Sequence, residues 1–171
     1  MNLSICTISF RHQLISIEEI AQWAQANHFQ GIELWGAHAN NLADQPHYDK
    51  HWLATYGLKT TMLSDYLPLL VSENVLYHKV QHLCRLAKHW GASKIRTFAG
   101  GKGSLDYTDS QKVELFNRLQ KICDWLAPHG LNLVIETHPK TYADSVTATQ
   151  EMFACVDRNN LQLNFDVLHV W

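Results

Sequence analysis

Two carboxylates in the last third of the sequence have the chemistry and the placement of metal ligands. Glu136 ends an apolar segment that begins at Leu131, and Asp166 lies near the end of the next one, which begins at Gln162. If these segments are neighbouring parallel strands, they lie about 4.8 Å apart, so both carboxylates can contact one cation. Oxygen ligands of this kind suit hard divalent ions, and the pair predicts a Mg²⁺ or Mn²⁺ site. For each carboxylate, capping a helix or pairing with a basic residue is the structural alternative.

A histidine accompanies each of the two carboxylates. His138 lies two residues after Glu136, and the alternation of a strand points both side chains to the same side. A metal ligand and a proton carrier would then share one cavity. His169 lies three residues after Asp166, on the turn that leaves the strand. A histidine taken alone is more often a structural group, and that alternative stays open for His169.

Polar side chains also follow the other apolar segments. Arg96 lies in an otherwise apolar strand, where a guanidinium requires an anion. That anion is either Glu33 or Asp65 of the chain, or a substrate carboxylate held by the planar guanidinium. Tyr66 and His38 follow two further segments and are candidates for substrate binding.

A repeated strand-and-helix framework is needed to bring these residues together. Six apolar, β-branched segments recur roughly every 30 residues, and amphipathic patterns separate them. A strand, a helix and two short loops fill such a period, so the sequence predicts consecutive βα units around a parallel sheet. The predicted strands begin at Leu3, Gly31, Lys59, Lys94, Leu131 and Gln162, the last one running to Val167.

Helix signals lie between the predicted strands. Ser16 and Glu19 have the spacing of a capping box before an apolar stripe. Apolar residues then step by three and four through residues 76–90, and again through residues 108–129, which also begin with a capping box. The segment 44–56 gives a weaker helical pattern.

Two architectures use such a repeat, an open doubly wound sheet and the closed (β/α)8 barrel. An open sheet normally has a Gly-rich turn after its first strand, but residues 7–11 contain no glycine. Polar side chains at many strand ends converge in a barrel mouth, whereas an open sheet offers no common centre. We therefore predict one α/β domain over residues 1–171, of the TIM-barrel type. A barrel needs eight strands and about 250 residues, so we expect these residues to reach only strand six.

Composition limits the classes of partner. The 171 residues are 46% hydrophobic and 18% charged, as in a globular domain with a buried core. The formal charge of −2 without a basic cluster disfavours nucleic acid. The sequence has neither the roughly 20 apolar residues of a membrane span nor a signal-peptide pattern, and its cysteines have no disulfide-framework spacing. We expect a cytoplasmic protein that binds a small molecule, without nucleic-acid or membrane partners.

Six stretches of the sequence resemble one enzyme family. They are CTISFRHQLI from Cys6, GIELWGAHANNL from Gly31, TMLSDYL from Thr61, KIRTFAGGKGS from Lys94, ETHPKTYADS from Glu136 and FDVLHVW from Phe165. Over its whole length the chain is similar to the metal-dependent 3-dehydroshikimate dehydratases of petrobactin-type siderophore biosynthesis. That family belongs to the xylose-isomerase-like TIM barrels, together with endonuclease four and ketose 3-epimerases.

The resemblance implies a metal-dependent elimination of water from 3-dehydroshikimate, which gives protocatechuate (3,4-dihydroxybenzoate). It makes Glu136 and Asp166 two of four metal ligands. The family's other two ligands, a histidine on strand seven and a glutamate on strand eight, have no counterpart in the sequence. The residues that the resemblance places at the substrate are His138, His169, Arg96 and Tyr66.

The implied chemistry assigns roles to those residues. A proton is lost next to the ketone, the resulting enolate expels the β-hydroxyl, and loss of a further proton gives the aromatic ring. His138 is expected to be the base, with a lysine of the family's strand seven as the competing candidate. His169 would be the acid that assists the leaving hydroxyl. Arg96 would bind the ring carboxylate and Tyr66 a substrate oxygen.

Two alternatives stay open. A sugar isomerase or epimerase would use the same metal pair but has less use for Arg96, and an incomplete barrel would have lost its function. Because strands at both ends would lack their neighbours, we expect the 171-residue chain by itself to aggregate or to form homo-oligomers. We also expect it to show no measurable dehydratase turnover until two further βα units are added.

Overall fold

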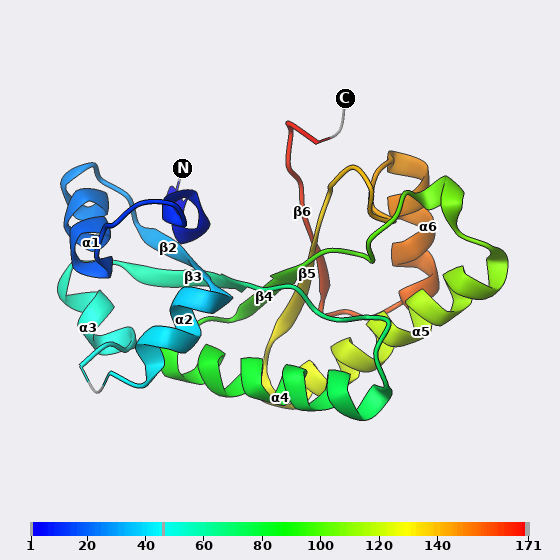
Figure 1. Cartoon of the computed structure of the whole chain (residues 1–171), viewed down its shortest axis with the longest axis horizontal. Coiled ribbons are helices and arrows are strands. Elements are labelled where there is room, and N and C mark those ends of the chain that lie inside the picture. Colours follow the sequence, from blue (N-terminus) through cyan, green and yellow to red (C-terminus); the bar gives the residue numbers. More distant parts are fainter. Residues whose placement is uncertain (1, 46, 170–171) are drawn as a thin grey trace. The chain divides into compact units, whose positions relative to one another are not determined.

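The computed structural model describes residues 2–45 and 47–169, in which strands and helices alternate along the chain (Figure 1). The order confirms the βα repeat that the sequence predicts. Three short 3₁₀ turns complete it, at Thr7–Phe10, Ser104–Asp106 and Ala127–His129. The elements are β1 (Ser4–Cys6), α1 (Ile17–Ala26), β2 (Gly31–Trp35), α2 (Gly36–Ala43), α3 (Lys50–Thr55), β3 (Lys59–Ser64), α4 (Glu73–Trp90), β4 (Lys94–Thr97), α5 (Asp109–Leu126), β5 (Asn132–Glu136), α6 (Val146–Val156) and β6 (Leu161–Asn164).

The six strands form one sheet in the order β1-β2-β3-β4-β5-β6. Strand β1 pairs with β2, β2 with β3, and β5 with β6, each time in parallel. A doubly wound sheet reverses its strand order at a switch point, whereas here the spatial order follows the chain, as in the wall of a βα barrel. The prediction of the barrel-type repeat over the open sheet is confirmed.

The chain divides into two compact units. The first contains the residues up to Asp65 together with Arg85–Ile95, and the second contains Tyr66–Cys84 and the residues from Arg96 onward. Helix α4 and strand β4 therefore contribute residues to both units. No helix among the described residues is long and apolar enough to cross a membrane.

The first unit packs α1 against its strands. The Ser16–Glu19 capping box forms as predicted, so the backbone N–H groups at the start of α1 are satisfied locally. The buried face of the helix then packs in an apolar cluster with β2, with α3 and with the residue that precedes β3. Its members are Ile20, Ala21, Ala24, Ile32, Leu53 and Leu58.

In the second unit, α5 covers the apolar side of the strands. Its predicted capping box forms between Thr108 and Gln111, and Gly130 ends the helical segment in a left-handed conformation, with φ of +66°. The stripe Leu115, Leu119, Ile122 and Leu126 is buried. Four of the five residues of β5 are buried as well, which is typical of a strand covered on both faces.

Side-chain hydrogen bonds mark the ends of two strands, one of which ends earlier than the sequence predicts. Strand β1 stops at Cys6, where the Thr7 hydroxyl accepts a hydrogen bond from Trp35 N at 2.9 Å. Strand β6 stops at Asn164 rather than Val167, and there the Thr137 hydroxyl accepts from Asp166 N at 2.9 Å. In both cases a side-chain oxygen replaces the backbone carbonyl that a longer ladder would supply, so the chain turns away.

Candidate metal and substrate site

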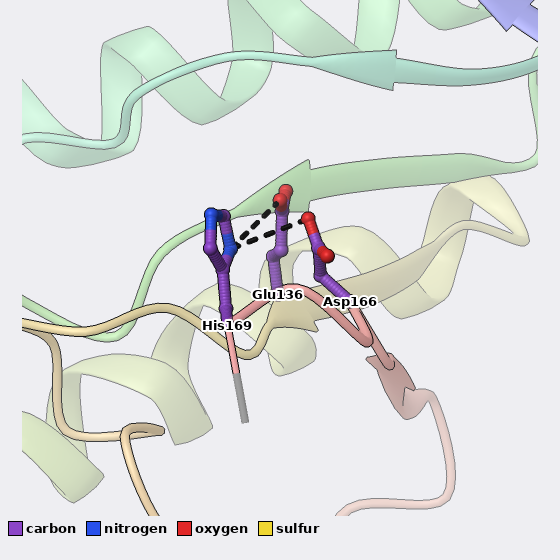
Figure 2. A group of neighbouring side chains, drawn as sticks. All are labelled: Glu136, Asp166 and His169. Atoms are coloured by element: carbon purple, nitrogen blue, oxygen red, sulfur yellow. Dashed lines mark ion pairs between the residues drawn. The ribbon is translucent and has the colours of Figure 1, made fainter. Parts of the chain in front are cut away.

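Three side chains of the second unit converge beyond the ends of β5 and β6 (Figure 2). Glu136 is the last residue of β5, and Asp166 and His169 lie in the turn after β6. One potential ligand atom from each lies within 4.8 Å of the others. The Nδ1 atom of His169 is 3.2 Å from Asp166 Oδ2 and 3.9 Å from Glu136 Oε1. The structure therefore brings together both carboxylates that the sequence singled out, with one of their histidines.

Backbone contacts fix the turn that carries Asp166 and His169. The Asp166 carboxylate accepts from Leu168 N at 2.8 Å, and the Asp166 carbonyl accepts from His169 N at 3.2 Å. Thr137, which is buried, anchors the turn to β5 because its hydroxyl accepts from Asp166 N. The sequence analysis did not single out Thr137, although a polar residue between Glu136 and His138 at a strand end was a visible signal.

The contacts of His169 indicate where its proton lies. Its Nδ1 is 3.0 Å from the Thr137 carbonyl oxygen, and two acceptors at that distance would repel each other. We therefore assign the proton to Nδ1, which donates to the carbonyl and faces the Asp166 carboxylate. In this tautomer Nδ1, the atom nearest the two carboxylates, offers no lone pair to a cation, so the ligands at this point of the cluster are the two carboxylates.

Arg96 has an anionic partner that the sequence analysis did not name. Its guanidinium Nη1 donates to Glu136 Oε2, and both residues are 8% exposed. The internal partners that we expected were Glu33 or Asp65, and this interpretation did not include the buried pair with Glu136. Because a buried guanidinium requires an anion, the pair explains how Arg96 is tolerated inside an apolar strand.

His138 is held on several sides. Its backbone N donates to the Ala143 carbonyl at 3.2 Å, and its own carbonyl accepts from the Thr141 hydroxyl at 2.8 Å. Its ring Nδ1 contacts the carbonyl oxygen of Pro139, which places a proton on Nδ1 and leaves the lone pair on Nε2. The imidazole centre lies 4.3 Å from that of His169, edge to face. The predicted base and acid are therefore neighbours.

The two remaining candidates lie in different units. Tyr66 belongs to the second unit, is 59% exposed and has its ring centre 5.6 Å from that of Phe98. His38 belongs to the first unit, in α2, where burial lowers the pKa of its imidazole. It lines a cavity of about 290 Å³ together with Phe10 and Tyr48. His38 is thus half-buried and lines a cavity within the first unit.

A larger cavity, of about 350 Å³, lies in the second unit. Leu69, the loop Gly100–Lys102 and the first half of α5 line it. None of the three clustered residues of Figure 2 is part of its lining. We place the candidate site at the cluster because the titratable groups and the buried ion pair are there.

A divalent cation fits the donor set of the cluster. One oxygen of Glu136 and one of Asp166 lie within 4.8 Å of each other, close to the separation of about 4.2 Å that two ligands of one ion can reach with bonds of about 2.1 Å. Both carboxylates supply oxygen, the donor that Mg²⁺ and Mn²⁺ prefer. Glu136 is buried and Asp166 half-buried, so an ion there would be partly withdrawn from solvent.

Comparisons with known proteins agree with this arrangement. Residues 21–171 match the family model described as xylose isomerase-like TIM barrel. The chain is 44% identical to a 3-dehydroshikimate dehydratase of Bacillus anthracis over an alignment that covers all of this chain and 63% of that protein. The chain thus spans less than two thirds of this relative's length.

Solved structures give the same picture of the fold. The crystal structure of the probable 3-DHS dehydratase AsbF, involved in petrobactin synthesis in Bacillus anthracis, matches with a TM-score of 0.95 and 44% identity, covering 100% of this chain and 65% of that one. The IolI protein with a bound zinc atom matches with a TM-score of 0.84 and 15% identity, covering 99% of this chain and 64% of that one. At this identity the second match shows a shared fold.

Proposed function

Because the chain belongs to the xylose isomerase-like TIM barrel family, we propose that it acts in the elimination of water from 3-dehydroshikimate to give protocatechuate, as part of siderophore synthesis. The observation that carries this proposal is a buried arginine, Arg96, paired with a candidate metal ligand in the same site as an imidazole base. A substrate with a carboxylate at one end and an acidic C–H beside a ketone at the other matches that combination. The 44% identity to a dehydratase of this specificity supports it.

His138 is the proposed base. The carbonyl of Pro139 holds the Nδ1 proton, so the Nε2 lone pair is the one that removes the proton next to the substrate ketone. The electrons of that C–H bond form the enolate, which then expels the β-hydroxyl. A second ring proton is lost while the former ketone oxygen gains one, and the aromatic diol results.

His169 is the proposed acid. The departing hydroxyl must take up a proton to leave as water. In its doubly protonated form His169 keeps the Nδ1 proton on the Thr137 carbonyl, next to Asp166, and can give its Nε2 proton to the hydroxyl, which leaves the neutral ring. Its ring lies beside that of His138, so proton removal and proton donation take place within one small volume. Because His138 gains a proton and His169 loses one, transfer of a proton from His138 to His169 would return both rings to their starting states after each turnover.

The carboxylates of Glu136 and Asp166 would hold a divalent cation, Mn²⁺ or Mg²⁺. When bound, such an ion draws electron density from the ketone oxygen and lowers the energy of the enolate by several kcal/mol. Glu136 can serve this role while its other oxygen stays on Arg96, because a carboxylate has two oxygens and several lone pairs.

Arg96 would bind the ring carboxylate of the substrate. One of its five N–H donors points to Glu136, and the planar guanidinium can offer others to a substrate carboxylate. Tyr66, exposed beside Phe98, would donate to a substrate oxygen. His38, which lines a cavity of the first unit, stays a substrate-binding residue predicted from the sequence.

The test supplies 3-dehydroshikimate to the chain extended by the two further βα units that turnover is expected to need, after removal of metal with a chelator, and again after addition of Mn²⁺ or Mg²⁺. Binding is followed by calorimetry and product by the absorbance of the catechol. We expect metal-dependent binding, with protocatechuate as the product. Arg96→Lys should weaken binding about tenfold because lysine keeps the charge but loses the planar donor pair. The matched control is Arg118→Lys in α5, which should bind like the wild type.

Two results would contradict the proposal. One is the epimerisation or isomerisation of a ketose without binding of 3-dehydroshikimate, which would establish the sugar-isomerase alternative. The other is an equal loss in Arg96→Lys for a substrate analogue that lacks the carboxylate, since the arginine would then have a purely structural role.

A further inference from the structure

Phe98 contacts three of the proposed site residues, although the proposed chemistry gives it no role. It follows β4 and lies two residues after Arg96, so strand alternation places both on the same side. Its ring centre lies 5.7 Å from the Arg96 guanidinium carbon, 4.8 Å from the His138 ring centre and 5.6 Å from that of Tyr66. From this arrangement we infer that Phe98 is a positioning residue, whose ring fixes Arg96 and His138 relative to each other.

The contact with Arg96 restricts the guanidinium. The negative face of an aromatic ring attracts a cation placed over it within about 6 Å. Glu136 accepts from one edge of the guanidinium. The Phe98 ring lies against the face of the group, and so helps to define the plane in which its N–H donors lie.

The contact with His138 restricts the imidazole. The two rings meet edge to face, with an interplanar angle of 63°, a favoured arrangement for aromatic pairs. On another side the imidazole meets His169 at 67°. The ring of His138 is therefore fixed by two aromatic neighbours and by the Pro139 carbonyl, which leaves little freedom for its Nε2.

The inference rests on the proposed function, because it states what this rigidity is for. A substrate held by its carboxylate on Arg96 presents its acidic C–H at a fixed distance along the ring, and the base must lie at that distance. Displacement of a catalytic group by about 1 Å lowers a rate roughly a hundredfold. Leucine or methionine in place of Phe98 would fill the space but would offer neither a flat surface nor a ring quadrupole.

The experiment compares Phe98→Leu and Phe98→Tyr with the matched control Phe116→Leu, each in the chain extended by two further βα units. Phe116 is a buried phenylalanine of α5 that packs on Tyr142, so its loss destabilises the same unit without touching the site. We expect Phe98→Leu to lower kcat at least tenfold and raise KM several-fold, while Phe98→Tyr stays within about twofold of wild type. Phe116→Leu should lower the melting temperature and leave both constants near wild type. Mn²⁺ affinity should be the same in all variants.

A second readout does not depend on turnover. The NMR signals of the Arg96 Nε–H and the His138 Cε1–H should lose their ring-current shifts in Phe98→Leu and keep them in Phe98→Tyr. Unchanged shifts and wild-type kinetics in Phe98→Leu would overturn the inference. If the wild type fails to bind 3-dehydroshikimate, the proposed function fails, and the NMR comparison alone decides the role of Phe98. If Phe98→Leu does not fold, Phe98→Met replaces it in both measurements.

Discussion

Replacement of Arg96 by methionine should show how strongly the second unit depends on one buried ion pair. Arg96 and Glu136 are each 8% exposed, so removal of the guanidinium leaves a buried carboxylate without its main compensating charge. Breaking a buried pair in this way costs about 3–5 kcal/mol. We expect the free energy of unfolding of Arg96→Met to fall by that amount in the absence of divalent metal.

The matched control is Arg118→Met in the same unit. Arg118 lies 3.6 Å from Glu114, whose side chain is 58% exposed, and such a pair contributes roughly 0.3–0.5 kcal/mol. Arg118 also donates to the Val71 carbonyl at 2.9 Å, a hydrogen bond that adds about 1 kcal/mol. The control should therefore lose less than half of what Arg96→Met loses.

The assay is urea denaturation followed by tryptophan fluorescence, with chelator present. A double variant, Arg96→Met with Glu136→Gln, separates the lost charge from the lost packing: the amide is neutral, so we expect about half of the stability to return. Mn²⁺ should also restore part of the stability of Arg96→Met, because the cation compensates the same carboxylate. An Arg96→Met variant no less stable than Arg118→Met would refute the reasoning.

Three further predictions concern other parts of the chain. Glu136→Gln and Asp166→Asn should each abolish bound Mn²⁺, measured by electron paramagnetic resonance, because a neutral amide attracts a hard cation weakly; unchanged occupancy in both would contradict the site. The Tyr142 hydroxyl holds the pKa of the Glu151 carboxyl below its ordinary value. The hydrogen bond between them therefore stabilises the fold above the ordinary carboxyl pKa, and this stabilisation is lost as pH falls through the lowered pKa. Tyr142→Phe should therefore lower the free energy of unfolding by about 1 kcal/mol near pH 7 and by less in acid. A difference between variant and wild type that stays constant in urea unfolding across pH would disprove this. Burial raises the pKa of the Cys123 thiol to about 12, so a thiol reagent should label exposed Cys155 first and Cys123 only on unfolding; equal labelling rates by mass spectrometry would contradict the burial.

Local patterns in the sequence predicted the repeat and its helices. The capping boxes at Ser16 and Thr108 and the left-handed stop at Gly130 form as expected. These features depend on hydrogen bonds and periodicities within a few residues of the chain. The parallel sheet predicted from these patterns also placed Glu136 and Asp166 at neighbouring strand ends, because such a sheet brings the carboxyl ends of its strands to one edge.

The contacts that build the site depend on the tertiary structure. The sequence named Glu33 or Asp65 as internal partners of Arg96, but the guanidinium donates to Glu136, which lies 40 residues away. The early end of β6 and the proton on His169 likewise depend on Thr137, a residue of the neighbouring strand's end.

The physical reason is register. Strands that are buried on both faces read as nearly continuous apolar segments, so the sequence of β5 carries little information about which residue of a neighbouring strand lies opposite. The register between two strands is set when the helices and strands pack together, and it decides which side chains meet across the sheet. The amino-acid sequence by itself determined the elements and the kinds of groups at their ends, and only packing decided that Arg96 meets Glu136 and that Phe98 lies between Arg96 and His138.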